Sequence, residues 1–86
     1  GDYQRAETLH RRALDLRRGL HGDRHDSVAS STNNLGLALE QQGRYDEAET
    51  IVEEGLDLVR AEPAAHELAI AHLNFNLGHV HLARNN

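Results

Sequence analysis

The sequence predicts an all-α protein, a solenoid of antiparallel helix pairs, and three observations support this prediction. The 86 residues contain an internal repeat in which residue n matches residue n + 42 without a gap. Within each copy, apolar residues recur every three or four positions, which is the spacing of one helix face. Aromatic residues make up only 3% of the chain, so the core must consist of Leu, Ala, Val and Ile. Such a core suits close-packed helices better than β-sheets.

The repeat is visible as identical triplets at matching positions. A shift of 42 residues aligns three of them: Ala6-Glu7-Thr8 with Ala48-Glu49-Thr50, Leu14-Asp15-Leu16 with Leu56-Asp57-Leu58, and Asn34-Leu35-Gly36 with Asn76-Leu77-Gly78. Conservative pairs such as Leu9 with Ile51 lie between them. The chain is therefore about two copies of one structural unit.

Each unit contains two helical patterns, which gives four expected helices at about residues 3–19, 27–41, 45–60 and 66–84. Asp26 or Ser27 is the expected N-cap of the second helix. Gly43 follows that helix as a residue that can adopt positive φ and end it. Pro63, in the connection 61–65, excludes a continuous helix from the third to the fourth.

Small residues stand on the buried faces where Leu would be expected, and they predict how the helices pack. These residues are Gly36, Ala48 and Gly55, with Gly78, Ala6 and Ala13 in the matching copy. A Gly inside a helix costs about 1 kcal/mol relative to Ala, which is tolerable where two backbones must approach closely. We therefore expect tight helix pairs packed in series, held by Leu35, Gly36, Tyr45, Ala48, Val52, Gly55, Leu77 and Gly78.

These residues also resemble a known family. The pattern Asn34-Leu35-Gly36, Leu39, Gly43-Arg44-Tyr45, Ala48, Val52, Gly55 and Leu58 resembles the tetratricopeptide repeat. The linker at residues 20–25 is similar to that of the 42-residue repeats of kinesin light chains and their bacterial relatives. By this resemblance residues 1–86 are one fragment of an array: 27–60 form a complete repeat of helix A and helix B, 2–19 form a preceding helix B, and 66–84 form a following helix A. Two departures are His10 and His81, at sites that are usually apolar or aromatic.

The resemblance implies a protein-interaction scaffold that binds a peptide or protein segment in a concave groove lined by the A helices. The implied groove residues are Asn33, Asn34, Leu37, Gln41, His72, Phe75, Asn76 and His79. An amide carries both a donor and an acceptor, so Asn34 and Asn76 suit the recognition of a peptide backbone. Two alternatives stay open. These amides serve neighbouring helices instead, or the module is a structural spacer or oligomerisation unit with no ligand of its own.

Other classes of function are disfavoured by the composition. The net charge of −5 argues against nucleic acid as a partner. The chain has no Cys and no Gly-rich phosphate loop, so we expect no enzyme, no catalytic residues and no cofactor. We expect no metal site either, since His79 and His81 point about 200° apart on a helix and His21 and His25 lie in a linker. No apolar run is long enough to span a membrane, and a cytoplasmic location is expected.

Charge is distributed unevenly along the chain and predicts self-association. The net charge is +2 in residues 1–25 and −7 in residues 26–86. The first and last expected helices each expose an apolar face, and arrays of fewer than three repeats are usually marginal. We expect the C-terminal helix of one copy to pack against the N-terminal helix of another, with a symmetric dimer as the alternative.

Overall fold

The computed structural model describes residues 2–85 and contains four α-helices in this range. These are α1 (Asp2–His21), α2 (Asp26–Gln41), α3 (Tyr45–Val59) and α4 (Glu67–Arg84), and residues 2–85 contain no strand. The expected unit 1–86 extends one residue beyond the described range at each end. The all-α class and the four expected helices are confirmed.

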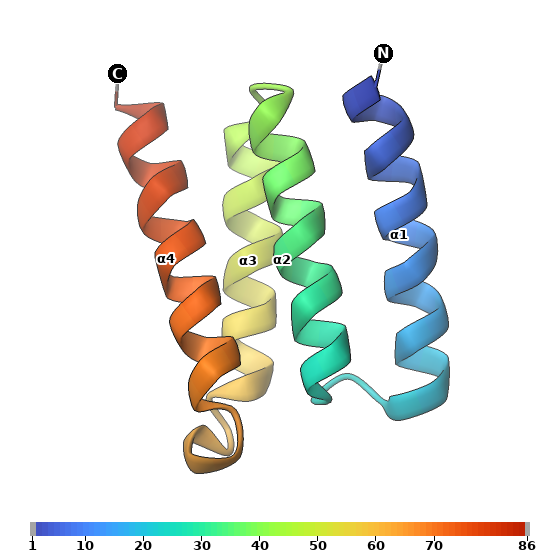
Figure 1. The fold of residues 1–86 in the computed structure, drawn as a ribbon. Helices are drawn as coiled ribbons and strands as arrows, with labels where there is room; N and C mark the ends of the chain where they lie inside the picture. Colours follow the sequence, from blue (N-terminus) through green and yellow to red (C-terminus); the bar gives the residue numbers. More distant parts are fainter. Residues whose placement is uncertain (1, 86) are drawn as a thin grey trace.

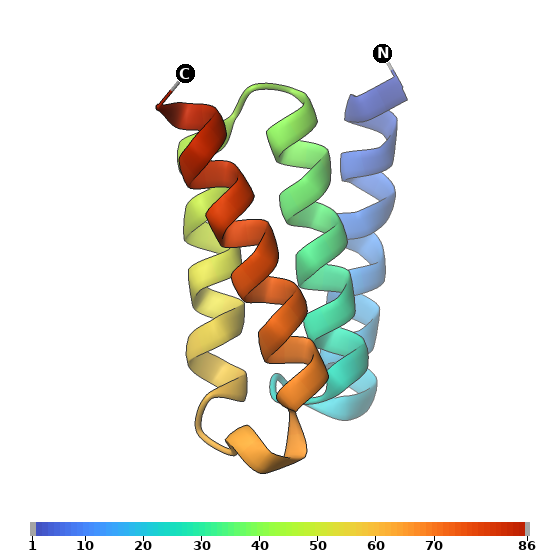
Figure 2. The same ribbon diagram turned by 60° about the vertical axis from the view of Figure 1, so that its left-hand side comes forward.

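The helices lie side by side and alternate in direction (Figure 1). Each helix packs on the next one along the chain, and α2 also packs on α4, so α2 contacts all three other helices. Figure 2 shows α4 lying obliquely across α2 and α3. The result is a slab of 34 × 26 × 16 Å in which α2 is the central element.

Two apolar clusters form the core. The first joins all four helices through Leu14, Val28, Leu35, Leu39, Ala48 and Val80, with Tyr45 and Ile51 packed against it. The second joins α2, α3 and α4 through Ala29, Val52, Leu56, Val59 and Leu73, with Ala69, Ile70 and Leu77 packed against it. Burial of these aliphatic side chains is the main source of stability, because each fully buried Leu or Val contributes about 1.5–3 kcal/mol.

The helix ends follow from a few residues, and one prediction about them was wrong. The N-cap of α2 is His25 rather than Asp26 or Ser27. Its Nδ1 accepts a hydrogen bond from the Ser27 backbone N–H at 3.0 Å, as an Asn or Ser oxygen does in an ordinary cap. Gly43 follows α2 with φ +75°, as expected. Pro63 begins a short 3₁₀ turn, η1 (Pro63–Ala65), that the sequence did not indicate.

The glycines of α2 and α3 lie where helices approach most closely. A β-carbon on Gly36 would lie 2.7 Å from Val52 Cγ2, and one on Gly55 would lie 2.8 Å from Thr32 Cγ2. Gly78 differs from the expectation, because it is exposed and no atom of another described helix lies within 4 Å of the position its β-carbon would take. The physical reason is that no helix within residues 2–85 packs on α4 as α3 packs on α2 at Gly36.

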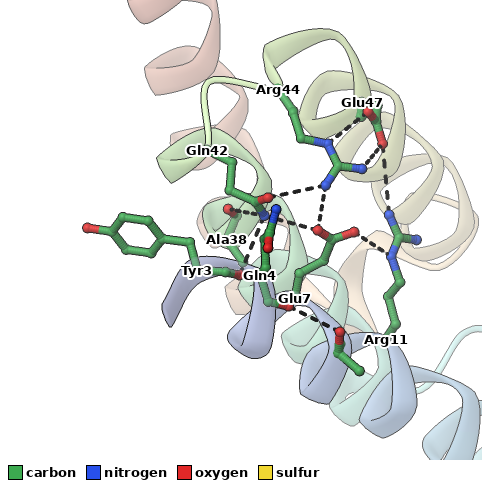
Figure 3. A network of polar contacts seen from close by, with 9 residues as sticks. Tyr3, Gln4, Glu7, Arg11, Ala38, Gln42, Arg44 and Glu47 are labelled. Atoms are coloured by element: carbon green, nitrogen blue, oxygen red, sulfur yellow. Dashed lines mark hydrogen bonds and ion pairs between the residues drawn. The ribbon is translucent and has the colours of Figure 1, made fainter. Parts of the chain in front are cut away.

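A polar network fixes α1 to the turn between α2 and α3 (Figure 3). The Glu7 carboxylate accepts hydrogen bonds from Gln42 Nε2 at 3.0 Å, Arg11 Nε at 2.9 Å and Arg44 Nη1 at 2.5 Å. Arg44 also pairs with Glu47. The hydrogen bonds from Gln42, Arg11 and Arg44 lower the pKa of Glu7 to about 2, because each of them favours the ionised carboxylate.

Candidate functional site

A hollow of about 350 Å³ lies between α2 and α4. It is lined by Asn33, Leu37, His72, Phe75, Asn76 and His79. These are six of the eight residues expected to form the groove. They meet because α2 and α4 are corresponding helices of successive units, so positions three or four apart on each helix face the same side.

Asn76 forms the floor of this hollow and is 2% exposed. Its Nδ2 donates to Asn33 Oδ1 at 3.0 Å and to the Asn33 backbone carbonyl at 3.3 Å. Its Oδ1 is buried and has no hydrogen-bond partner among residues 2–85. Gly36 makes room for this amide, because a β-carbon there would lie 3.1 Å from Asn76 Nδ2. A buried acceptor without a donor is costly, by about 1–3 kcal/mol.

The walls of the hollow are largely apolar and open to solvent. Phe75 is 77% exposed, and Leu37 on α2 is also exposed. His72 and His79 are exposed and lie one turn before and one turn after Phe75 on α4. The exposed Phe75 and Leu37 together make this hollow a candidate binding surface.

A second hollow of about 230 Å³ extends the first toward the start of both helices. It shares Asn33 and His72 with the first and is lined further by Asp26, Ala29, Ser30, Leu68 and Ala69. Together the two hollows form a continuous line of lining residues along α2 and α4, which we call the α2–α4 trough. Its shape suits an extended chain rather than a compact small molecule.

Asn34 and Gln41, the other two expected groove residues, do not line either hollow. Both are exposed. Asn34 corresponds to Asn76 in the repeat, yet the two amides have different surroundings. Asn76 on α4 faces α2, whereas no described helix lies beside α2 in the equivalent place for Asn34. The two amides therefore differ in their surroundings, and a role for Asn34 in peptide binding stays a prediction.

The sequence interpretation missed the acidic groups at the two ends of the trough. Glu40 Oε1 contacts His79 Nδ1, and its Oε2 is buried without a partner in the described part of the chain. At the other end, Asp26 Oδ1 lies 2.5 Å from His66 Nδ1. Glu40 could have been found from spacing, since Asn33, Leu37 and Glu40 follow one another on one helix face.

Among residues 2–85, one group of possible metal ligands occurs outside the trough. Glu49, Glu53 and His81 have ligand atoms that all lie within 4.8 Å of one another. The guanidinium of Arg84 also contacts Glu49 and pairs with Asp46. A metal ion at Glu49 would have to displace this cation. His79 and His81 contact different carboxylates, Glu40 and Glu49, as their directions on the helix require.

Fold and trough together define an α-solenoid of helical hairpins with an exposed groove. The family model described as "Tetratricopeptide repeat" matches residues 1–61 and again residues 30–86, so this chain belongs to the tetratricopeptide repeat family. No curated protein and no solved structure matches the chain. Repeats of this family generally mediate protein–protein interactions and are typically non-catalytic scaffolds. Over residues 2–85, none of the helices combines the length and the apolar character needed to cross a membrane.

Proposed function

We propose that this chain is an interaction scaffold that binds an extended peptide or protein segment in the α2–α4 trough. The observation that carries the proposal is the buried, unpartnered Oδ1 of Asn76 beneath a hollow with the exposed Phe75 in its wall. Once the Asn76 amide turns toward the hollow, a backbone N–H of a bound segment satisfies this acceptor without any requirement on sequence.

The chemistry of the trough suggests which segments fit it. Leu37 and Phe75 offer apolar contact for one large side chain next to the backbone N–H that reaches Asn76. The residues that line the two hollows include no Arg, and the chain contains no Lys. Capture of a terminal carboxylate is therefore disfavoured. Carboxylates at both ends, Asp26 and Glu40, disfavour an acidic segment.

A peptide library displayed on phage, selected against the 86-residue protein, tests the proposal. Selected peptides should share a large apolar residue and should lose most of their affinity for Phe75→Ala and for Asn76→Ala. Asn34→Ala is the matched control, because Asn34 is the repeat counterpart of Asn76 but lies outside the trough. Circular dichroism would verify that each variant is folded. Peptides that bind all three variants equally well would refute the proposal.

The second candidate function is a structural spacer or oligomerisation module with no ligand. It is favoured by the bonds of Asn76 to Asn33, which show that this amide also serves a neighbouring helix. Failure to select any trough-dependent peptide would support this function. The resemblance to kinesin light chains and the cytoplasmic location stay predictions.

A further inference from the structure

The outer face of α1 exposes apolar residues whose repeat counterparts on α3 are partly buried. Tyr3, Leu9 and Leu16 are 52%, 57% and 65% exposed. Their counterparts are Tyr45, Ile51 and Leu58, all of intermediate burial. Tyr45 and Ile51 are covered because α3 packs between α2 and α4 and contacts the first core cluster. In the repeat, α1 corresponds to α3, and α3 is covered on one side by α2. No described helix covers the corresponding side of α1.

The outer face of α4 shows the complementary difference. Gly36 on α2 is in close contact with α3, whereas its counterpart Gly78 has open space beside it. Gly36 is a position where α3 packs on α2. At Gly78 on α4, no described helix takes the corresponding place.

The outer face of α4 therefore corresponds to the face of α2 that packs on α3. The outer face of α1 corresponds to the face of α3 that packs on α2. We propose that a second copy of this chain stacks head to tail on the first, so that α4 of one copy packs on α1 of the next as α2 packs on α3. In this register His10 of the next copy takes the place of Val52 and lies against Gly78. Gly78, like Gly36, carries no side chain that would oppose the residue packed on it.

Charge supports a second copy as the occupant. Three acidic positions of α3, namely Glu47, Glu53 and Glu54, correspond to Arg5, Arg11 and Arg12 of α1. Within one molecule, Arg11 Nη2 on α1 lies 3.9 Å from Glu47 Oε2 on α3. When the 42-residue repeat shift is applied to this pair, Glu53 of one copy lies beside Arg5 of the next. The pair has opposite charges again, with the signs exchanged.

Stacking of this kind uses different faces on the two copies, so it is heterologous and can propagate. Weight-average mass is expected to rise steadily with concentration rather than to stop at a dimer. The proposal rests on the repeat geometry and is independent of the trough. Asn76→Ala should leave it unchanged, and loss of self-association should leave peptide binding intact.

Sedimentation velocity over a range of concentrations tests the stacking directly. Gly78→Leu should weaken association at least about tenfold, equivalent to about 1.4 kcal/mol, because the added side chain occupies the junction, whereas its β-carbon has open space in the single copy. Gly19→Leu is the control, since Gly19 is also a helical glycine with open space around it and its counterpart Ala61 is exposed. A folded monomer at every concentration, or association that Gly78→Leu leaves unchanged, would overturn the proposal.

Charge reversal tests the register. Arg5→Glu alone and Glu53→Arg alone each place like charges at the junction and should weaken association a few-fold, the range of an exposed ion pair. An equal mixture of the two variants should restore it, because alternating copies again oppose Glu to Arg at every junction. A symmetric dimer through α1 would not be restored by this mixture. That result, or insensitivity of the single variants, would overturn the head-to-tail register.

Discussion

Gly36 and Val52 are in such close contact that a β-carbon on Gly36 would lie 2.7 Å from Val52 Cγ2. Val52 is fully buried and branched next to its own backbone, so its methyl group cannot move away without disturbing the second core cluster. The glycine is therefore a requirement of the α2·α3 contact. Its repeat counterpart Gly78, with open space around it, provides an internal comparison.

We predict opposite effects of the same substitution at these two glycines. Gly36→Ala should destabilise the fold by up to about 2 kcal/mol, because the overpacking cost of about 1–3 kcal/mol is offset by only about 1 kcal/mol of helix propensity. Gly78→Ala should stabilise the monomeric protein by up to about 1 kcal/mol, since only the propensity changes. Urea denaturation followed by circular dichroism measures both. Equal effects at the two positions would contradict the close contact.

The two glycines also show how far the sequence could predict the packing. Periodicity and the 42-residue match predicted the four helices and the burial of Gly36, because helix formation and the buried face of a helix can both be inferred from the spacing of apolar residues. The exposure of Gly78 could not be predicted in this way. Internal repetition makes equivalent positions look alike, whereas burial depends on whether a neighbouring helix is present, and position within the array decides that.

The Glu7 network should make stability depend on acid pH. The folded pKa of Glu7 is about 2, below its ordinary value of 4.5, so the unfolded chain takes up the proton first as pH falls. The contribution of Glu7 is therefore complete above about pH 4.5 and is lost progressively between about pH 4.5 and 2. Thermal unfolding of the wild type and Glu7→Gln should differ at pH 7, and the difference should shrink across this interval.

Gln42→Ala supplies an independent check of the same network. The hydrogen bond from Gln42 is the largest cause of the lowered pKa of Glu7, so its removal should raise that pKa toward the ordinary value. NMR titration of the Glu7 side-chain carboxyl measures this shift without reference to stability. A carboxyl that titrates near 4.5 in the wild type would contradict the network shown in Figure 3.

His25 should act as a helix cap. Its Nδ1 accepts from the Ser27 backbone N–H at 3.0 Å, which satisfies one of the first N–H groups of α2. His25→Ala should destabilise the protein by about 0.5–2 kcal/mol, and His25→Asn, which keeps an acceptor at the cap, should recover most of the loss. Urea denaturation of the three proteins distinguishes a cap from simple packing, for which Asn would not substitute.

The trough was predictable in part, and the reason lies in Asn76 and Asn34. Residue type and family pattern indicated that both amides matter, and six of the eight expected residues do line one hollow. Asn76 lies buried against Asn33, whereas Asn34 is exposed. This difference depends on the contact between α2 and α4, which cannot be predicted from a local sequence pattern. The spacing of Glu40 from Asn33 and Leu37 places it on the same helix face, but its contact with His79 on α4 could not be predicted from that spacing.

A covalent tandem provides the last prediction, because it makes the proposed stacking intramolecular. In the 42-residue register Arg84 corresponds to Gln42 and Gly1 to Gly43, so residue 84 of one copy can be joined directly to residue 1 of another. In repeat proteins the stability is approximately a sum of repeat and interface terms, so a third contact of the α2·α3 kind should raise it. The tandem should unfold at a higher urea concentration, and with a steeper dependence on urea, than the single chain. Introducing Gly78→Leu into the first copy of the tandem should remove this gain. Two copies that unfold at the midpoint of the single chain would show that α4 and α1 do not recognise each other.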